Sequence, residues 1–204
     1  MSRRWVSERK RDPYYKRAKR ENYYSRAAYK LMQMDERFGI IRKGDAVIDL
    51  GAAPGGWSQV AVERSAPDGL VISIDLRRIS EIKGAITMRG DAFAPETVEK
   101  IIALLESKGR GRADVILSDM SPNISGVYDI DHAKSIDLVK RAMELCGALL
   151  RPGGTFVAKV FEGESMKELK NEAKERFRMV KPHSPDATRE RSSEIYIVCK
   201  GFRS

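Results

Sequence analysis

Residues 45–60 read DAVIDLGAAPGGWSQV, a short apolar run followed by a turn of glycines and other small residues. The run has the length and β-branched content of a buried strand, and SQVAVERS behind the turn is typical of a helix. Because glycine has no Cβ, such a turn lets the backbone approach a bound ligand closely. A dinucleotide site would read G-x-G-x-x-G, whereas here the spacing is Gly51-x-x-x-Gly55-Gly56. The turn alone is therefore compatible with a ligand site or with a plain tight connection.

Strand-like and helix-like segments alternate outward from this turn. We expect helices at 25–39 (with Ser25 as N-cap), 58–65, 95–109, 131–150 and 164–177, and strands at 45–50, 70–76, 85–91, 113–119, 155–161, 179–185 and 194–202. The last two strands are expected to form an antiparallel pair. Such alternation predicts an α/β fold, with a mainly parallel seven-stranded sheet and helices on both faces. Residues 122–133 lack helical periodicity and are predicted to form a loop over the site.

The chain has 204 residues, 33% of them charged and 42% hydrophobic, which suits one soluble domain. No apolar run approaches the roughly 20 residues of a membrane span, and the N-terminus lacks the apolar region of a signal peptide. These features predict a cytoplasmic protein without membrane contact. Cys146 and Cys199 lie in apolar patterns and are predicted to be reduced core residues. No metal site is predicted, and because no spare amphipathic surface stands out, we expect a monomer.

The excess positive charge is concentrated at one end of the chain. The net charge is +9, and residues 1–30 alone hold 11 Lys and Arg against three Asp and Glu. The same region carries Trp5, Tyr14, Tyr15, Tyr23, Tyr24 and Tyr29. Basic side chains bind phosphates and aromatic rings stack on bases. We therefore expect residues 1–24 to be an RNA-binding arm and residues 25–204 to be the main domain; a solubilising tail is the alternative.

Three acidic residues follow strand-like segments. Asp75 and Asp119 each close a buried apolar run, and Asp91 closes the run at 85–91. In doubly wound folds, ligands bind beyond the carboxyl ends of the strands, where a carboxylate can accept ribose hydroxyls. We expect Asp75 to accept hydrogen bonds from ribose hydroxyls and Asp91 to accept one from an adenine amino group. Together with the glycine turn, these acids favour a nucleoside ligand that needs no phosphate site, and S-adenosylmethionine fits that description.

Several motifs occur in an order that resembles a known family. They are DLGAAPGGWSQV, ISIDL, GDAF, LSDMSPNISG, GGTFVAKVFEG and SSEIYIVCKGF. From residue 22 to the C-terminus the chain resembles the FtsJ family of S-adenosylmethionine-dependent 2′-O-ribose methyltransferases. This resemblance implies a Rossmann-like class I methyltransferase fold. It also implies cofactor contacts at Gly55, Trp57, Asp75, Asp91 and Asp119.

The resemblance further implies a catalytic Lys-Asp-Lys-Glu tetrad made of Lys30, Asp119, Lys159 and Glu194. A ribose 2′-hydroxyl must lose its proton as it attacks the methyl carbon. A lysine can accept that proton only in its neutral form, which burial beside another cation favours. In the family view Lys159 is the base, Lys30 is the second cation, Asp119 orients Lys159, and Glu194 holds Lys30 or the ribose. From the pattern alone, each could instead be a surface charge or part of a structural ion pair.

The family branch that the chain resembles methylates a uridine of 23S ribosomal RNA, in the A-loop of the large ribosomal subunit. A transfer-RNA 2′-O-methyltransferase of the same family would have almost the same core motifs. A non-catalytic RNA-binding assembly factor is a further alternative, which the intact tetrad disfavours. A nicotinamide-dependent dehydrogenase is disfavoured by the absence of G-x-G-x-x-G.

Overall fold

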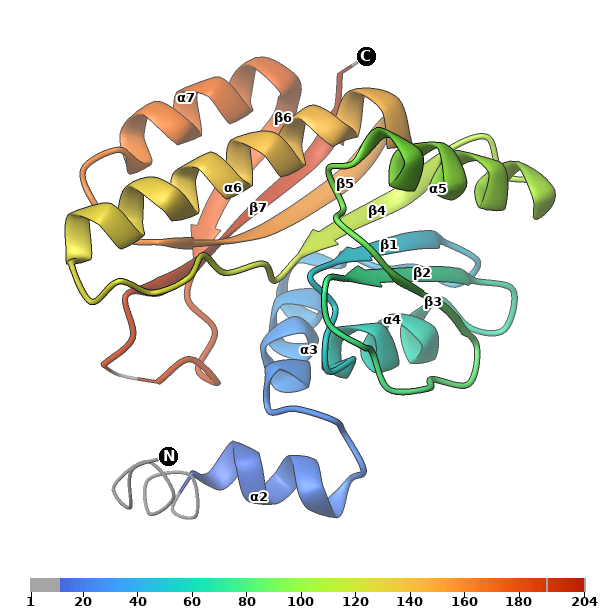
Figure 1. Ribbon diagram of the computed structural model, residues 1–204, viewed down its shortest axis with the longest axis horizontal. Helices are drawn as coiled ribbons and strands as arrows, with labels where there is room; N and C mark the ends of the chain where they lie inside the picture. Colours follow the sequence, from blue (N-terminus) through green and yellow to red (C-terminus); the bar gives the residue numbers. More distant parts are fainter. Residues whose placement is uncertain (1–11, 190, 204) are drawn as a thin grey trace.

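The computed structural model describes residues 12–189 and 191–203 and has the predicted α/β architecture (Figure 1). The helices are α2 (Pro13–Arg20), α3 (Ala27–Phe38), α4 (Gly56–Ser65), α5 (Pro95–Ser107), α6 (Tyr128–Leu149) and α7 (Met166–Arg176). The strands are β1 (Ala46–Leu50), β2 (Leu70–Asp75), β3 (Ala85–Arg89), β4 (Ala113–Ser118), β5 (Leu150–Phe161), β6 (Phe177–His183) and β7 (Glu194–Phe202).

The seven strands form one sheet in the order β3-β2-β1-β4-β5-β7-β6. Strand β7 runs antiparallel to both of its neighbours, and the remaining adjacent pairs are parallel. The strand order reverses between β1 and β4, which are both central and almost wholly buried. At such a switch point the connections leave in opposite directions and open a crevice at the carboxyl ends of the strands.

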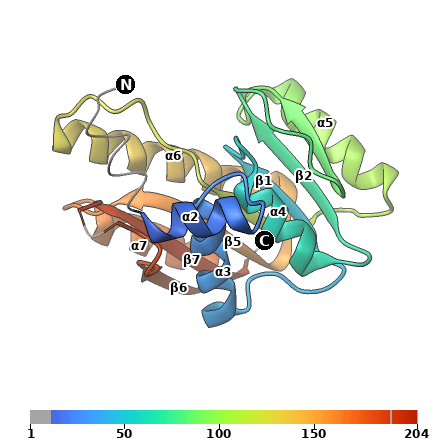
Figure 2. The same ribbon diagram turned by 90° about the horizontal axis from the view of Figure 1, so that it is seen from below.

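Helices cover both faces of the sheet. Figure 1 shows α5, α6 and α7 on one face and α3 and α4 on the other, and Figure 2 shows α3 and α4 from their own side. Helix α3 buries Ala28, Leu31 and Met34 at helical spacing against the sheet, and it ends at Gly39, whose φ of 58° is left-handed. Glycine adopts that conformation without strain, which explains why the helix stops there.

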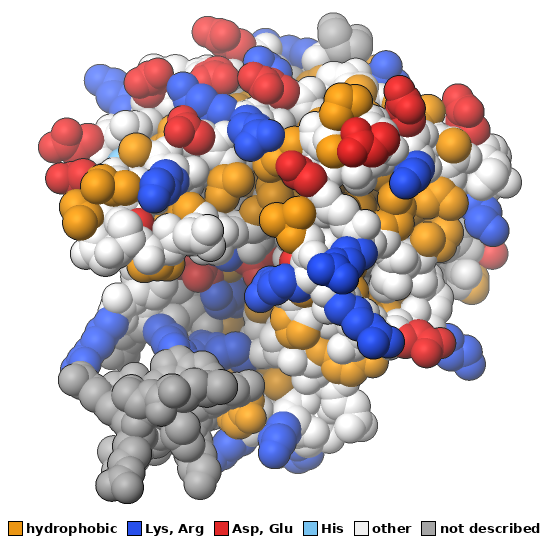
Figure 3. Space-filling view, in the orientation of Figure 1, with side chains coloured by type: hydrophobic (Ala, Val, Ile, Leu, Met, Phe, Trp, Pro, Cys, Tyr) orange, Lys and Arg blue, Asp and Glu red, His pale blue; other side chains and the backbone are white. Residues whose placement is uncertain are grey.

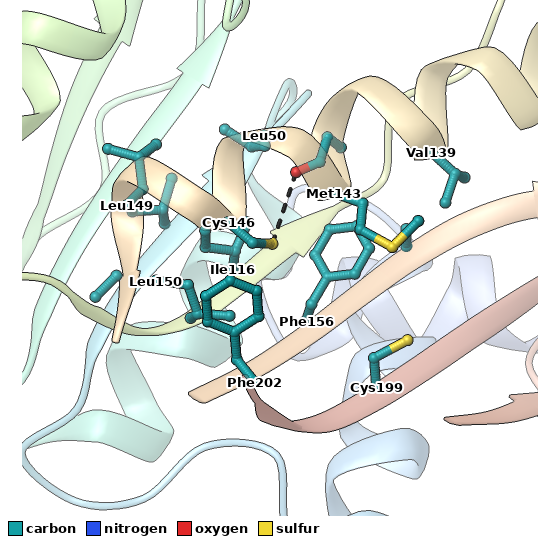
Figure 4. Packing of buried hydrophobic residues seen from close by; sticks show 14 of the residues in the cluster. Leu50, Ile116, Val139, Met143, Cys146, Leu149, Leu150, Phe156, Cys199 and Phe202 are labelled. Carbon is teal, nitrogen blue, oxygen red and sulfur yellow. Dashed lines mark hydrogen bonds between the residues drawn. The ribbon is translucent and has the colours of Figure 1, made fainter. Parts of the chain in front are cut away.

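The larger hydrophobic core lies under α5, α6 and α7, and both cysteines belong to it. Cys146 on α6 and Cys199 on β7 are free and buried, as predicted, among residues such as Phe156 and Phe202 (Figure 4). Burial raises the pKa of both thiols, so they remain protonated. Both cysteines therefore serve packing.

Two predictions about helix starts are wrong. The long helix begins at Tyr128, so only the first part of the 122–133 segment is a loop. Its first turn is supported by Asp131, which accepts hydrogen bonds from the backbone of Ser125 and Gly126. Helix α3 has Arg26 as its N-cap, without a side-chain bond to the helix, so Ser25 does not cap it. Within the described residues, no helix is long and apolar enough to cross a bilayer.

The described part of the predicted arm packs onto the domain. Tyr14 and Tyr23 contact the buried ring of Tyr29, with centroids 5.6 and 5.8 Å away, and Ala18 is buried beside them. Asp12 forms an ion pair with Arg26. These tyrosine rings thus contribute to packing rather than standing free for bases. Residues 1–11, which include Trp5, lie outside the described residues, so the role of the arm in RNA binding stays a prediction.

Candidate active site

Strand register places three of the predicted site residues, together with Gly51 of the glycine turn, on one line across the sheet. Leu50 is paired with Ile74 on β2 and with Ser118 on β4, and Ser118 is paired with Ala158 on β5. The residues immediately after these partners are Gly51, Asp75, Asp119 and Lys159. Because parallel strands end at the same edge, residues distant in sequence meet at the switch point.

A cleft of about 700 Å³ opens at this edge. It is lined by all four residues of that line, by Asp91 and Phe93 after β3, and by residues 120–123 after β4. Leu76 lines it too, and its side chain is 67% exposed. Arg141 on α6 lies over the ring of Phe93, with its guanidinium carbon 3.9 Å from the ring centroid. The volume and mixed polar and apolar lining suit a nucleoside-sized ligand.

Asp75 and Asp91 differ in how firmly they are held. Asp75 is buried and accepts hydrogen bonds from the backbone of Ala53 (2.9 Å) and Arg77 (2.8 Å). The exposed guanidinium of Arg77 also contacts the Asp75 carboxylate, at 3.3 Å. Asp91 is exposed and accepts a bond from the backbone of Phe93 (3.0 Å). Each carboxylate oxygen retains acceptor capacity toward the cleft.

Lys159 and Asp119 form the centre of the site. The Lys159 ammonium donates to the backbone carbonyl of Asp119 at 2.7 Å and to its carboxylate at 3.1 Å. The Lys159 side chain is only 10% exposed. The structure therefore places Asp119 in direct contact with Lys159, and the orienting role that the family resemblance implies stays a prediction.

Lys30 and Glu194 reach the same place from other elements. The Lys30 ammonium on α3 forms an ion pair with the Glu194 carboxylate at the start of β7. Tyr196 joins the two halves of the tetrad: its phenol donates to Glu194 and lies 3.2 Å from the Asp119 carboxylate. Lys159 and Tyr196 are direct partners in the β5–β7 ladder, so their side chains share one face. The structure therefore brings all four predicted residues together through a fifth, which the sequence reasoning missed.

Burial and charge act in opposite senses on Glu194. Burial raises its pKa, but the charges of Lys30 and Lys159, with hydrogen bonds from Lys30 and Tyr196, outweigh this and bring the pKa below its ordinary value. Burial, reinforced by Asp119 and Glu194, holds the pKa of Tyr196 well above its ordinary range. Glu194 is accordingly an anion at neutral pH, and Tyr196 is a neutral phenol that can donate its proton.

Gly55 and Trp57 are not among the residues that line the cleft. Gly55 is the N-cap of α4 with a φ of 121°, and a Cβ there would lie 2.7 Å from the side chain of Ile82. Trp57 is buried, and its indole N–H donates to the Ala27 carbonyl at 2.8 Å. That bond fixes the start of α3, which carries Lys30. Contact of these two residues with a cofactor stays a prediction.

Asp49 is a second residue that the sequence reasoning missed. It is fully buried in β1, where Ser58 on α4 donates to one carboxylate oxygen at 2.6 Å. Its other oxygen is buried without a partner among the described residues. Burial raises the pKa of Asp49 to about 7, partly offset by the Ser58 bond and reinforced by the charges of Asp119 and Asp75. An acid within an otherwise apolar strand was the signal available in the sequence.

Replacing Tyr196 by phenylalanine should lower kcat for the reaction proposed below by about 10- to 100-fold, since a buried carboxylate loses its shared donor. Cofactor affinity should be unchanged, because Tyr196 does not line the cleft. Steady-state kinetics and calorimetric titration would measure the two effects. The matched control is Tyr23→Phe, which removes a phenol bonded to Glu63 at 2.7 Å, away from the cleft. Equal kcat values for the two variants would contradict the linking role of Tyr196.

Comparisons with known proteins show which family the chain resembles. A family model described as FtsJ-like methyltransferase matches residues 23–202. A ribosomal RNA large subunit methyltransferase E of Methanothrix thermoacetophila is 48% identical over 95% of this chain and 74% of its own length. The enzyme of the same name from Archaeoglobus fulgidus is 47% identical over 95% of this chain and 97% of its own.

Solved structures show the same architecture. A Plasmodium falciparum chain described as a ribosomal RNA methyltransferase is 29% identical, with a TM-score of 0.79 over 88% of this chain and 98% of its own. Aeropyrum pernix fibrillarin, solved with bound S-adenosylmethionine, is 17% identical, with a TM-score of 0.56 over 85% of this chain and 73% of its own. This likeness concerns the fold alone, which is that of class I methyltransferases, as expected. The chain belongs to the FtsJ-like methyltransferase family.

Proposed function

We propose that this protein transfers a methyl group from S-adenosylmethionine to a ribose 2′-oxygen in ribosomal RNA of the large subunit. The observation that carries the proposal is the linked set of Lys30, Asp119, Lys159, Glu194 and Tyr196 at one end of a nucleoside-sized cleft. The names of the relatives support ribosomal RNA as the substrate. The finer assignment, to a uridine in the A-loop of 23S RNA, rests on the family resemblance.

The lining of the cleft fits S-adenosylmethionine. Gly51 leaves the floor without a side chain, Asp75 and Asp91 offer carboxylates to ribose hydroxyls and an adenine amino group, and exposed Leu76 offers an apolar surface to the base. Gly55, the N-cap of α4, and Trp57 in its first turn do not line the cleft, and their contact with the cofactor rests on the family resemblance. When bound, S-adenosylmethionine would supply an activated methyl group on a cationic sulfur.

The tetrad would then position and deprotonate the acceptor. Lys159 Nζ, in its neutral amine form, takes the proton of the 2′-hydroxyl while Asp119 holds the amine in place. Lys30 Nζ, steadied by Glu194, places a second cation near the oxygen. Alignment of the 2′-oxygen with the methyl carbon accounts for much of the expected acceleration. No metal ion enters this mechanism, and we propose that the protein acts as a monomer in the cytoplasm.

Transfer of labelled methyl groups to three substrates would test the proposal. They are large subunits from cells that lack the enzyme, the matching free 23S RNA, and bulk transfer RNA. The modified nucleotide is mapped by its resistance to alkaline cleavage, which a 2′-O-methyl group blocks. Label at one uridine of large-subunit RNA is expected. Label on transfer RNA alone would overturn the substrate assignment, and cofactor binding without transfer to any substrate would overturn the enzymatic role.

The basic arm should contribute affinity that depends on salt. Lys16, Lys19 and Arg20 on α2 are exposed, and Arg20 shares Glu21 with Arg17, at 3.2 and 3.0 Å. The variant with alanine at Lys16, Lys19 and Arg20 should bind RNA more weakly. The slope of log affinity against log salt concentration should be smaller in magnitude by about two. Fluorescence anisotropy at several salt concentrations would measure this.

The control for the arm is the variant in which three exposed lysines are replaced by alanine: Lys100 on α5, Lys108 at its C-cap and Lys174 on α7. The two helices cover the face of the sheet opposite α3 and α4 (Figure 1). Affinity for S-adenosylmethionine should stay the same in both variants. If the arm variant loses cofactor and RNA affinity equally, the arm supports the fold and does not contact RNA.

A further inference from the structure

Exposed large hydrophobic side chains gather beside the candidate active site. Among the described residues they are Tyr24, Leu76, Ile124, Val127, Tyr128 and Ile130. Leu76 lines the cleft, and Tyr24 lies against the turn at Gly55. The other four fall within seven residues, at the start of α6 and just before it. We call Ile124, Val127, Tyr128 and Ile130 the apolar edge, and none of them lines the cofactor cleft.

The apolar edge is held in a defined conformation. Asp131 accepts hydrogen bonds from the backbone and hydroxyl of Ser125, both at 2.7 Å, and from the backbone of Gly126 at 3.1 Å. The Tyr128 phenol donates to the Glu162 carbonyl just beyond β5. The ring of Tyr128 is therefore tethered at its tip, yet the residue is 53% exposed. An aromatic ring fixed in this way loses little conformational entropy when a partner stacks on it.

The edge is continuous with the active site. Residues 121–123 line the cleft beside Asp119 and lead directly into Ile124. Glu162, to which Tyr128 is tethered, follows Lys159 by three residues, which corresponds to about 10 Å along a strand. A nucleic-acid strand covers that distance in about three stacked nucleotides, and in fewer when it is extended. In Figure 3 hydrophobic side chains gather at the α6 end of the molecule, above a recess with acidic and basic side chains on its floor.

We propose that the apolar edge is a stacking platform for an unpaired base of the RNA, within a few nucleotides of the ribose that is methylated. This inference rests on the proposed function. Four side chains are too few for a stable protein interface, which buries about 800 Å² per partner, whereas a base needs one ring face and its apolar surroundings. Around the edge, Asp129, Asp131 and Glu162 outnumber the exposed Lys134, so the surroundings are net acidic and do not attract phosphates. The platform therefore acts through stacking and not through phosphate contacts.

The test compares Tyr128→Ala, Tyr128→Phe and Tyr128→Trp with wild type in binding to a short fluorescent oligouridylate at several salt concentrations. The alanine variant should bind about 5- to 100-fold more weakly. Its salt dependence should match that of wild type, unlike that of the arm variant. The phenylalanine and tryptophan variants keep a ring but lose the tether to Glu162, so they should bind slightly more weakly than wild type and much more tightly than the alanine variant. S-adenosylmethionine affinity should be the same in all four proteins.

Three results would overturn the platform: unchanged RNA affinity in the alanine variant, an equal loss in the phenylalanine variant, or a loss on intact large subunits without one on free RNA. The second would assign the effect to the tether at Glu162, and the third would assign the edge to a protein partner. Methyl transfer by wild type is measured separately. A wild type that shows the ring-dependent RNA binding but transfers no methyl group would refute the proposed function and leave the platform standing.

Discussion

Replacing Lys159 by methionine is expected to lower kcat for methyl transfer by about 10²- to 10⁴-fold, the usual contribution of a positioned general base. Methionine has nearly the same length and is apolar, so it can fill the space that the lysine stem occupies. The variant loses both the proton acceptor and the bonds to Asp119. Affinity for S-adenosylmethionine should change much less than kcat. Single-turnover kinetics on large subunits would measure the chemical step.

Two further variants make the Lys159 result specific. Lys159→Arg keeps the positive charge but cannot release a proton at neutral pH, so it should be nearly as inactive as the methionine variant. Lys140→Met removes a lysine of α6 that pairs with Glu168 and Glu172 and does not line the cleft, so it should be as active as wild type. An arginine variant with most of the wild-type kcat would show that charge, and not proton transfer, is what Lys159 provides.

Replacing Asp49 by asparagine should remove a large dependence of stability on pH. Burial raises the pKa of Asp49 to about 7, above the value near 4 expected in the unfolded chain. Between pH 4 and pH 7, roughly, Asp49 is therefore protonated in the folded state and ionised in the unfolded chain. This contribution to stability is complete below the unfolded pKa and is lost as the pH rises through the folded pKa. Relative to the asparagine variant, the free energy of unfolding of wild type should fall by roughly 2 to 3 kcal/mol between pH 5 and pH 8.

Urea denaturation of both proteins at several pH values would measure that difference. The comparison with the variant matters because every other titrating group is common to both proteins and cancels. Asp68→Asn, at an exposed position in the turn before β2, serves as a surface control and should track wild type. If the difference in the free energy of unfolding between wild type and Asp49→Asn is constant across this pH range, Asp49 ionises in the folded protein as it does in the unfolded chain.

Much of the architecture could be predicted from local pattern. Strand and helix periodicities placed every strand of the sheet, and the small-residue turn at 51–56 marked the edge where the cleft lies. The start of α6 was missed because its first turn, YDID, alternates apolar and acidic residues and so lacks the helical period, and because Tyr128 and Ile130 are exposed. Its support comes from Asp131 bonding back to Ser125, a contact between a side chain and a loop that no periodicity reports.

The residues of the candidate site also differ in how far the sequence could predict them. Asp75 and Asp119 could be proposed from sequence because each closes a buried run, and parallel strands bring such positions to one edge. Lys159 lies within β5 and was assigned by the family resemblance. Lys30 and Glu194 had no local signal of their own and depended on the family resemblance. Tyr196 was missed because it resembles an ordinary strand residue until its neighbours across the sheet are known, and Asp49 was missed although an acid within an apolar strand is itself a signal.

The sequence by itself determined the alternation of elements, the glycine turn and the acids at the strand ends, since these follow from local sterics and from periodic burial of apolar side chains. Only the tertiary structure decided that Lys30 on α3 and Glu194 on β7 form an ion pair and that Tyr196 joins them to Asp119. Pairing between charges 164 residues apart depends on strand order and helix packing. A polar side chain becomes costly or functional only once burial removes it from water, and burial is a property of the assembled fold.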